Sequence, residues 1–459
     1  MADTDVDLVI LGGGSGGYAC ALRASELGMS VVLVDKDKLG GTCLHYGCIP
    51  TKALLHAGEI ADGARESEQF GVRATFEGID AEAVKKYKDG VVTRLYKGLQ
   101  GLVTSRGIQF VQGEGRLVSP TAIQVGDTTY QGRHVVLATG SVPKTLPGLD
   151  VDGQRVIFSD HALDLDRVPA SAVILGGGVI GVEFASIWKS FGADVTVVEA
   201  LPHLLPLEDE ASSKLLERAF RRRGIAAKVG ARFAGVEHTD GGVRVSLESG
   251  DQVEAEMLLV AVGRGPVSQG LGYEDVGVAT DRGFVKVDAY CQTNVATISA
   301  VGDLVPSPQL AHVGFGEGIL VAERLASLPV VPIDYFGVPR VTYSEPEVAS
   351  VGLTEAQAVE TYGADSVRTL TYDLAGNGKS QILRTAGAVK LVAEKDGPVL
   401  GVHIVGRRVG ELLAEAQLIY NWEALPSEVA QLIHAHPTQS EAVGEAHLAL
   451  AGKPLHMHS

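Results

Sequence analysis

Cysteine is scarce in this sequence, because only four of the 459 residues are Cys. A small secreted domain held together by disulfides carries a much higher density, so that class is excluded. No apolar stretch approaches the ~20 residues that a membrane-spanning helix needs. The opening residues, MADTDVDLVILGGG, have no basic leader and no signal-peptide core. We therefore expect a cytoplasmic protein without a membrane segment.

Positive charge is also in short supply. The chain has 39 Lys and Arg against 56 Asp and Glu, a formal net charge of −17. Nucleic acids and anionic lipid surfaces are bound by clustered Lys and Arg. The one dense basic run, Arg221 to Arg223, ends the amphipathic stretch EASSKLLERAFRRRGI and is expected to be a solvated helix end. We expect neither a nucleic-acid nor a membrane partner.

Glycine, in contrast, is abundant. It makes up 57 of the 459 residues, about 12% against a usual ~7%. The sequence has no Gly-X-Y period, so the glycines indicate tight turns and close approaches of the backbone to ligands. With 45% hydrophobic residues the chain is globular, and its length suggests roughly three domains at about 150 residues each.

An internal repeat organises the first half of the chain. VDLVILGGGSGGYACALRASELGMSVVLVD and the later SAVILGGGVIGVEFASIWKSFGADVTVVE both predict a strand, a glycine turn, a helix and a second strand. The repeated positions are Gly12, Gly14, Gly17, Gly28 and Asp35 in the first copy and Gly176, Gly178, Gly181, Gly192 and Glu199 in the second. Two such motifs in register are a strong signal for dinucleotide binding.

The chemistry of this spacing is specific. The first glycine makes the tight turn, the second lets the backbone approach a pyrophosphate, and the third permits close helix–strand packing. The helix N-terminus supplies amide donors, and the acid that ends the second strand accepts hydrogen bonds from a ribose. Asp35 and Glu199 are therefore the expected ribose ligands. The alternative is a pair of structural βαβ units that bind no ligand.

Other segments fit around the two copies. HVVLATG (134–140) and MLLVAVG (257–263) each predict a closing strand, and ATISAVGD predicts a short strand that ends at Gly302 and Asp303. The last ~120 residues change character. They contain the strand-like PRVTYS, AVKLVAEKD and VLGVHIVG, followed by the helical VGELLAEAQLIYNW.

The segment GGTCLHYGCIPTK carries Cys43 and Cys48. A disulfide between them would close a very short loop. Loop-closure entropy gives such a disulfide a stabilisation of roughly 2 kcal/mol, so a purely structural disulfide would contribute little. Pro50 suits the first turn of a helix, which places Cys48 at a helix N-terminus where the dipole and Lys52 favour its thiolate. A metal-binding pair is the alternative, but zinc would need two further ligands. We interpret the pair as a redox centre.

The two other cysteines, Cys20 and Cys291, are expected to be inert.

A histidine is the natural base for thiol–disulfide exchange, because its pKa lies near neutral pH. His436 stands out among thirteen histidines, since Pro437 restricts its backbone and Glu441 is close enough to orient its ring. His434 is the competitor, two residues away. The two histidines of the C-terminal PLHMHS are interpreted as ordinary polar residues.

Taken together, these motifs resemble the flavin-dependent pyridine nucleotide–disulfide oxidoreductases. The similarity runs essentially end to end, through GGGSGG, GGTCLHYGCIPTK, LATGS, GGGVIGVE, AVGR, AVGD and HAHPTQSE. The resemblance implies an α/β fold with two Rossmann-like dinucleotide-binding domains, one for FAD and one for NAD, and a C-terminal α+β dimerisation domain. The implied division is 1–145 for FAD, 146–270 for NAD, 271–337 completing the FAD side and 338–459 for dimerisation.

The resemblance also implies roles for individual residues. Cys43 is the outer thiol that exchanges with substrate, Cys48 is the inner thiol beside the flavin, and Lys52 lies near the flavin ring, paired with Glu183. His436 is the base and Glu441 its partner, and together they serve the neighbouring subunit of a homodimer. The implied FAD contacts are Gly12, Gly14, Gly17, Asp35, Lys52, Thr139, Gly140 and Asp303. The implied NAD contacts are Gly176, Gly178, Gly181, Glu199 and Gly263.

The implied reaction is oxidation of protein-bound dihydrolipoyl groups, with electrons passing through the disulfide and FAD to NAD. The implied partners are the lipoyl domains of a dihydrolipoamide acyltransferase or of a glycine cleavage H protein, and no metal is expected. A glutathione- or mercuric-reductase-like enzyme and a non-catalytic scaffold or redox sensor are the alternatives. The sequence departs from the family pattern at His45, Thr51 and Val313, which leaves the tuning of the site open.

Overall fold

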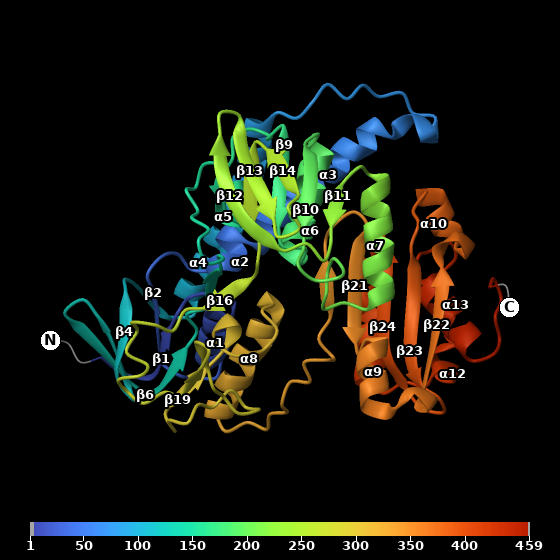
Figure 1. Cartoon of the computed structure of the whole chain (residues 1–459). Coiled ribbons are helices and arrows are strands. Elements are labelled where there is room, and N and C mark those ends of the chain that lie inside the picture. The colour runs from blue at the N-terminus through green and yellow to red at the C-terminus, as the bar shows by residue number, and fades with distance from the viewer. Residues whose placement is uncertain (1–3, 458–459) are drawn as a thin grey trace.

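The computed structural model describes residues 4–457 and divides into three parts (Figure 1). An N-terminal module lies at the lower left of the figure, a second module lies at the top, and a C-terminal part lies at the right. Each part is built around its own β-sheet. Both repeats found in the sequence fold as predicted, and they form the centres of the first two sheets.

The sheet of the first module has the order β3-β2-β1-β6-β5-β4, and β19 also pairs with β6. The central strand β1 (Thr4–Leu11) is parallel to β2 (Val31–Asp35) and to β6 (Thr128–Leu137). Its other strands are β3 (Gln109–Gln112), β4 (Gly115–Ser119), β5 (Ala122–Val125) and β19 (Ile298–Ala300). Its helices are α1 (Ser15–Glu26), α2 (Gly41–Tyr46), α3 (Cys48–Arg65), α4 (Ala81–Ser105) and α8 (Ala311–Leu325). The central part of the sheet, residues 8–11, 31–34 and 135–137, consists of buried Val, Ile and Leu, because α1 packs against β1 and β2 and α8 packs against α1.

The second module repeats this plan. Its parallel sheet has the order β11-β10-β9-β15-β8. These strands are β8 (Val156–Ile157), β9 (Ser171–Leu175), β10 (Asp194–Val198), β11 (Ala226–Lys228) and β15 (Met257–Val260). The helices are α5 (Ser159–Leu163), α6 (Val179–Phe191) and α7 (Glu210–Arg222), and an antiparallel sheet is formed by β12 (Phe233–Thr239), β13 (Gly242–Leu247) and β14 (Gln252–Ala255).

The chain crosses between the two modules twice, and the crossings lie side by side. It leaves the first module through β7 (Ser141–Pro143) and returns through β16 (Arg264–Pro266), and these two strands pair antiparallel. A further short pair, β17 (Thr280–Asp281) and β18 (Phe284–Val285), follows the return. The second module is therefore an insertion into the first.

The C-terminal part is an antiparallel sheet with the order β20-β21-β24-β23-β22. Its strands are β20 (Arg340–Thr342), β21 (Glu347–Gly352), β22 (Val367–Asp373), β23 (Ala388–Glu394) and β24 (Val399–Gly406). Its helices are α9 (Glu355–Tyr362), α10 (Gly378–Leu383), α11 (Leu413–Asn421), α12 (Pro426–Val429) and α13 (Glu441–Leu450). Strand β24 is buried along its whole length because α11 covers one face and α7 of the second module contacts the strand.

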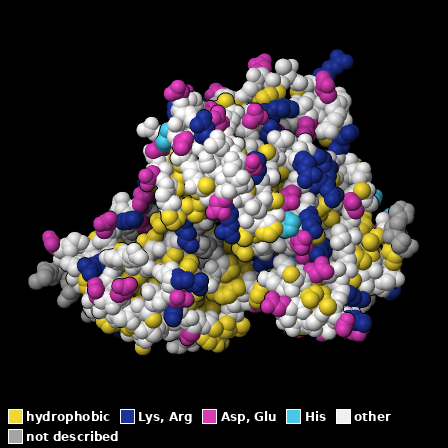
Figure 2. Space-filling model, in the orientation of Figure 1, with side chains coloured by type: hydrophobic (Ala, Val, Ile, Leu, Met, Phe, Trp, Pro, Cys, Tyr) yellow, Lys and Arg dark blue, Asp and Glu magenta, His cyan; other side chains and the backbone are white. Residues whose placement is uncertain are grey.

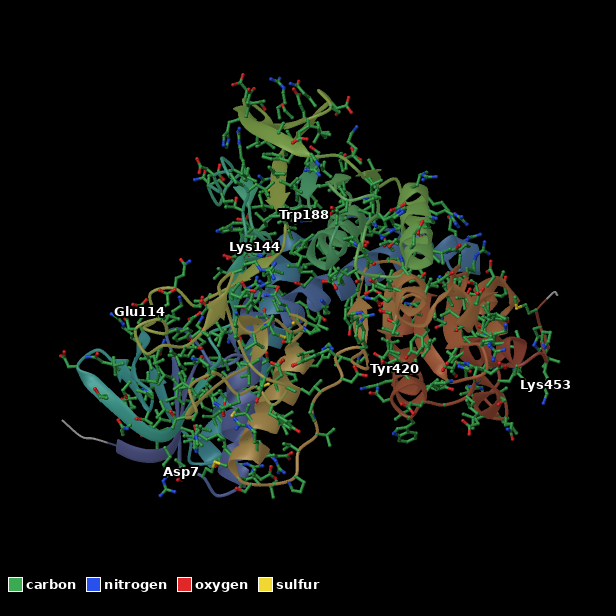
Figure 3. All side chains as sticks on the ribbon, turned by 60° about the horizontal axis from the view of Figure 1, so that its bottom comes forward. Asp7, Glu114, Lys144, Trp188, Tyr420 and Lys453 are labelled. Atoms are coloured by element: carbon green, nitrogen blue, oxygen red, sulfur yellow. The ribbon has the colours of Figure 1, made fainter. Side chains whose placement is uncertain are left out.

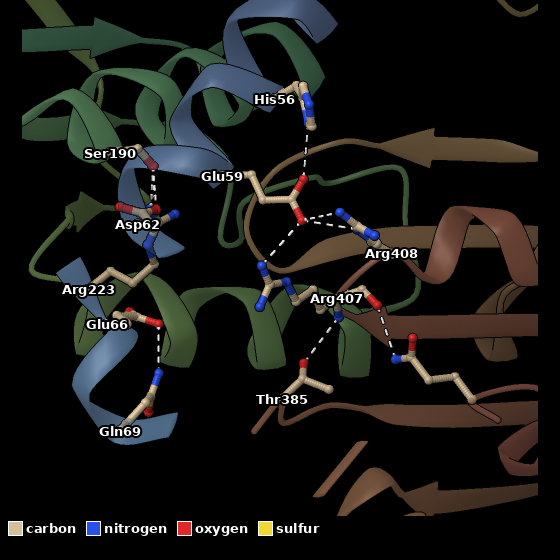
Figure 4. Close-up of polar contacts among 11 residues, drawn as sticks. His56, Glu59, Asp62, Glu66, Gln69, Ser190, Arg223, Thr385, Arg407 and Arg408 are labelled. Carbon is tan, nitrogen blue, oxygen red and sulfur yellow. Dashed lines mark hydrogen bonds and ion pairs between the residues drawn. The ribbon is translucent and has the colours of Figure 1, made fainter. Parts of the chain in front are cut away.

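Polar side chains join α3 to both other parts (Figure 4). Asp62 accepts hydrogen bonds from Ser190 at 2.6 Å and from Arg223 at 2.9 Å. Glu59 accepts from Arg407 at 3.2 Å and from Arg408 at 3.0 Å. The expectation that the whole basic run is solvated is wrong for Arg223, whose side chain is only 19% exposed because it reaches across to Asp62.

The apolar core between the second module and the C-terminal sheet is continuous. Trp188, labelled in Figure 3, projects from α6 into this core. Its ring packs edge-on against Phe184, with 5.6 Å between the ring centroids. Val348 and Val405 of the C-terminal sheet belong to the same core. The orientation of the C-terminal part is therefore fixed by hydrophobic burial as well as by ion pairs.

Replacing Trp188 with Ala tests this shared core. The side chain is 3% exposed, so its removal should lower the free energy of unfolding by about 3–5 kcal/mol. Thermal unfolding followed by calorimetry measures the loss. Phe70→Ala is the control, because that ring is 48% exposed and its removal should change stability little. Equal losses in the two variants would contradict the assignment of Trp188 to the core.

Candidate active site

One large cavity lies where the three parts meet. Its volume is about 1620 Å³, and hydrophobic side chains gather around the hollow in the middle of the surface shown in Figure 2. Among the predicted site residues, its lining includes Gly14, Cys43, Cys48, Lys52, Gly140, Asp303, Gly176, Gly178, Glu183, Glu199 and Gly263. Both glycine loops and the cysteine pair therefore open into one space.

The first glycine loop has no room for a side chain at Gly12 or Gly17. Gly12 has φ +109°, and a Cβ atom there would overlap the carbonyl oxygen of Ala138. A Cβ at Gly17 would overlap the carbonyl oxygen of Gly12. The loop can therefore turn tightly into α1 only with glycine at both positions.

The second loop repeats this arrangement. Gly176 has φ +110°, and a Cβ there would overlap the carbonyl oxygen of Ala261, while one at Gly181 would overlap that of Gly176. Gly178, in contrast, faces open space and caps α6 without a side chain. A backbone that is exposed at a helix N-terminus is suited to a pyrophosphate.

The two acids take equivalent positions. Asp35 accepts hydrogen bonds from Gly13 N at 2.6 Å and Asp37 N at 2.8 Å. Glu199 accepts from Gly177 N at 2.6 Å and from Leu201 N at 2.8 Å. Each carboxylate oxygen can accept a second bond, so both acids are held in place with capacity left for ribose hydroxyls. The two modules fit a dinucleotide each.

Not every predicted FAD contact points into the cavity. The Thr139 hydroxyl donates to the carbonyl oxygen of Val267 at 2.6 Å and contacts the Tyr273 hydroxyl at 3.0 Å, so its hydrogen bonds are made within the protein. Asp303 lines the cavity and accepts a hydrogen bond from Ser141 Oγ at 2.5 Å. Gly140 also lines the cavity, and its backbone has a positive φ of +70°.

The two redox cysteines lie on consecutive helices. Cys43 belongs to α2, and Cys48 is the first residue of α3, as the sequence predicts. Both are free thiols in the structure. A hydrogen bond from the Cys43 thiol, together with the charge of Lys52, lowers the pKa of Cys48 to about 7. The same hydrogen bond and burial raise the pKa of Cys43. Cys48 is thus the member of the pair that ionises first.

Lys52 forms an ion pair with Glu183 across the boundary between the modules. Its Nζ lies 2.9 Å from Oε1 and 2.8 Å from Oε2 of that carboxylate. Burial alone would lower the pKa of Lys52, but the charge and hydrogen bonds of Glu183, together with Cys48 and Tyr343, raise it overall. Tyr343 of the C-terminal part places its ring 4.9 Å from the ammonium and donates its backbone N–H to Glu183 at 3.0 Å. The ammonium is therefore held charged beside Cys48.

His436 and Glu441 are paired but lie away from these thiols in the single chain. His436 Nδ1 is 2.8 Å from Glu441 Oε1, and the imidazole is 78% exposed. Thr438 N donates to the second carboxylate oxygen at 2.8 Å. Among residues 4–457, those that line the cavity include neither His436 nor Glu441. The competitor His434 is largely buried and pairs with Glu415 at 2.8 Å.

The remaining histidines and cysteines from the sequence analysis do not contribute to the site. His456 pairs with Glu445 at 2.8 Å, and His458 lies outside the described residues. Cys20 and Cys291 are buried, and burial raises the pKa of Cys20 to about 12 and that of Cys291 further. Neither thiol ionises readily, which favours the expected inertness.

The three departures from the family pattern do not disturb this geometry. His45 contacts the carbonyl oxygen of Leu39 at 2.8 Å and packs edge-on against Tyr96. Thr51 is buried, and Val313 is buried at the cavity wall.

Sequence reasoning missed Arg264. It donates from Nε to Ser141 Oγ at 2.7 Å and from Nη2 to the Ser141 carbonyl at 2.7 Å, so it joins the two crossing strands, and its Nε lies 4.0 Å from Asp303 Oδ2. The signal was the AVGR motif, in which Arg264 directly follows the predicted Gly263. The sequence around Tyr343 carries no such signal, because the residues that Tyr343 contacts, Lys52 and Glu183, lie in distant segments of the chain.

This fold and this site define a disulfide oxidoreductase with two dinucleotide sites. The family model for pyridine nucleotide-disulphide oxidoreductases matches residues 6–318, and the model for their dimerisation domain matches residues 338–447. The chain therefore belongs to the pyridine nucleotide-disulphide oxidoreductase family.

Individual relatives are similar over almost the whole length. A dihydrolipoyl dehydrogenase of Bacillus subtilis (strain 168) is 41% identical over 473 residues, covering 99% of each chain. The mitochondrial dihydrolipoyl dehydrogenase of Pisum sativum is 39% identical and covers 98% of this chain and 92% of its own. The crystal structure of LpdA from Mycobacterium tuberculosis superposes with a TM-score of 0.89 at 28% identity, covering 97% of this chain and 99% of that one.

These comparisons confirm the predicted family, the α/β fold with a dimerisation domain, and the function of an oxidoreductase enzyme that uses FAD and NAD. The dimerisation domain supports the predicted homodimer. Within residues 4–457, no helix is both long enough and apolar enough to cross a membrane. The roles of the individual site residues stay predictions.

Ionisation of Cys48 can be measured directly. The reduced protein should gain one thiolate with a midpoint near pH 7, visible as ultraviolet thiolate absorbance that is missing in Cys48→Ser. In Lys52→Met the midpoint should move to higher pH, because the neighbouring positive charge is lost. An unchanged midpoint would show that Lys52 does not act on Cys48.

Proposed function

We propose that this chain is a dihydrolipoyl dehydrogenase that oxidises protein-bound dihydrolipoyl groups with NAD+. The observation that carries the proposal is the position of Cys43 and Cys48 in one cavity with both glycine loops. The names of the relatives above support the choice of substrate. When bound, FAD supplies a two-electron acceptor between the thiol pair and NAD+.

The thiol chemistry follows from the two cysteines. In the oxidised enzyme, a substrate thiolate attacks the Cys43 sulfur, the Cys43–Cys48 bond breaks, and Cys48 leaves as a thiolate. The second substrate thiol, once deprotonated, attacks the substrate sulfur of this mixed disulfide and releases Cys43. The substrate leaves as a cyclic disulfide, and the enzyme keeps both electrons as a dithiol. Cys48 is a good leaving group because the positive charge of Lys52 stabilises its thiolate.

The remaining roles are assigned from the geometry. We assign His436 as the base that takes the substrate protons, and Glu441 as the residue that orients its ring and stabilises the imidazolium. Lys52 and Glu183 keep a positive charge at the thiolate. Gly12, Gly14, Gly17, Asp35, Gly140 and Asp303, with the backbone of Thr139, would hold FAD, and Gly176, Gly178, Gly181, Glu199 and Gly263 would hold NAD.

The partners are the lipoyl domains of an acyltransferase or of a glycine cleavage H protein. The cytoplasm is the proposed location, because a chain with only four cysteines, two of which form a catalytic pair, suits a compartment in which structural disulfides are rare. The proposed division of the chain is 1–145 for FAD, 146–270 for NAD, 271–337 completing the FAD side and 338–459 for dimerisation. The paired crossings β7 and β16 support the first two boundaries.

An assay with purified enzyme tests the reaction and the choice of nucleotide. Dihydrolipoamide should be oxidised with NAD+ and not with NADP+, because Glu199 would repel the additional 2′-phosphate. Glu199→Ala should raise the use of NADP+ relative to NAD+. Asp194→Ala is the control, because Asp194 is an exposed acid at the start of β10, the strand that leads to Glu199. Turnover of glutathione disulfide in place of lipoamide, or a wild-type preference for NADP+, would contradict the proposal.

Mixed dimers test whether the site is shared between subunits. If each His436 serves the opposite chain, Cys43→Ser and His436→Ala homodimers should each be inactive, the latter by about 10²–10⁴-fold. A heterodimer of the two keeps one site with both cysteines and an intact histidine, so activity should return after subunit exchange.

The matched control for this experiment is a heterodimer of Cys43→Ser with Cys48→Ser. Both changes affect the same half of the site, so no complete site forms and activity should stay absent. Verified Cys43→Ser and His436→Ala heterodimers that stay inactive would show that His436 does not act across the dimer.

A further inference from the structure

One loop connects the proposed NAD site to the dimerisation domain. Residues 200–209 run from Glu199 to the start of α7, and Leu207 and neighbouring residues of this loop form a wall of the cavity. The loop ends with Glu208 and Asp209, whose side chains are 9% and 3% exposed. Two consecutive carboxylates are therefore buried at the end of a cavity-lining loop.

The near end of this loop is attached to the second glycine loop. Leu205 N donates to the carbonyl oxygen of Gly177 at 2.8 Å, and Leu204 is fully buried against the same glycine. Gly177 N in turn donates to Glu199 at 2.6 Å. A shift of the loop would therefore move both the glycine loop and the carboxylate expected to bind the ribose.

The far end of the loop is attached to the dimerisation domain. Lys390 Nζ lies 2.7 Å from Asp209 Oδ1 and 2.7 Å from Glu355 Oε2, and the backbone N–H of Glu355 donates to Asp209 Oδ2 at 3.0 Å. Ser350 Oγ donates to Glu208 at 2.6 Å. Both carboxylates are thus held by residues far away in the sequence.

Two of the residues that hold the loop, Ser350 and Lys390, form a polar row with His403 in an otherwise apolar sheet face. Ser350, His403 and Lys390 are direct neighbours across β21, β24 and β23, and all three are buried. Val348 and Val405 on the same strands pack against the core of the second module. Well-packed hydrophobic residues would stabilise this contact at least as well, so stability alone does not account for a buried charge network.

We propose that Asp209 and Lys390 are positioning residues for NAD binding. The dimerisation domain holds the end of loop 200–209 through this ion pair, and the loop holds Gly177 and Glu199 in the geometry that the nucleotide needs. This inference rests on the proposed assignment of the second module to NAD. It adds a second task to the dimerisation domain, which acts on the nucleotide site of its own chain.

Lys390→Met in the full-length holoenzyme tests the proposal. The dissociation constant of NADH, followed by fluorescence titration, should rise at least about fivefold, the lower end of ordinary coupling between sites. The KM for NAD+ should rise with it, while kcat at saturating NAD+ stays near the wild-type value. Lys390→Arg keeps the charge and should recover most of the affinity.

Lys88→Met is the matched control. Lys88 is also a buried lysine, 5% exposed, but it donates to the carbonyl oxygen of Leu163 at 2.8 Å, away from the loop. This variant should lose thermal stability and keep the wild-type affinity for NADH. An equal loss of affinity in Lys88→Met would overturn the proposal, because the effect would then be general.

A second variant that removes less of the network tests the proposal if Lys390→Met does not fold. Ser350→Ala removes only the hydrogen bond to Glu208, and the dissociation constant of NADH should rise about twofold or more. A folded Lys390→Met or Ser350→Ala enzyme with wild-type affinity for NADH would overturn the proposal. NADH binding is measured without a dithiol, so an enzyme that binds NADH but does not turn over dihydrolipoamide would contradict only the proposed function.

Discussion

The ion pair between Lys52 and Glu183 is the contact on which the arrangement of the active site depends. Lys52 belongs to the redox helix of the first module, and Glu183 belongs to the nucleotide helix of the second. The same carboxylate accepts a backbone hydrogen bond from Tyr343 of the C-terminal part. All three parts of the chain therefore meet at one buried carboxylate, and an independent movement of any part would remove at least one of its partners, which is costly in a protein interior.

The redox helix α3 carries its chemistry and its attachments on one stripe. Cys48 and Lys52 are four residues apart and therefore share a face of the helix. Further along, Glu59 and Asp62 hold the dimerisation domain and the second module (Figure 4). The helix that carries Cys48 and Lys52 is thus the same helix that the ion pairs hold, so the position of the thiolate is set by the packing of the domains.

The sequence predicts best those features that depend on the local backbone. Gly12 and Gly176 were identified from spacing alone, because a turn with positive φ and a nearby carbonyl excludes every larger residue. The position of Cys48 at a helix start was likewise predictable from Pro50. The partners of Thr139, Arg223 and the loop 200–209 were not, because each is set by contacts over more than 100 residues of sequence, which composition and periodicity do not reveal.

The proposed base, like the thiols, is already held in place by contacts within a single chain. Glu441 begins α13, and its carboxylate is fixed by the backbone N–H of Thr438 while it holds the ring of His436. The imidazole is therefore oriented by residues within a few positions of itself, although it stands exposed at the surface of its own chain. A base that is already oriented needs only to be brought to the thiols, and two-fold docking of the dimerisation domains would supply that step in the proposed shared site. Exposure of His436 in the single chain is thus a property that a shared site requires.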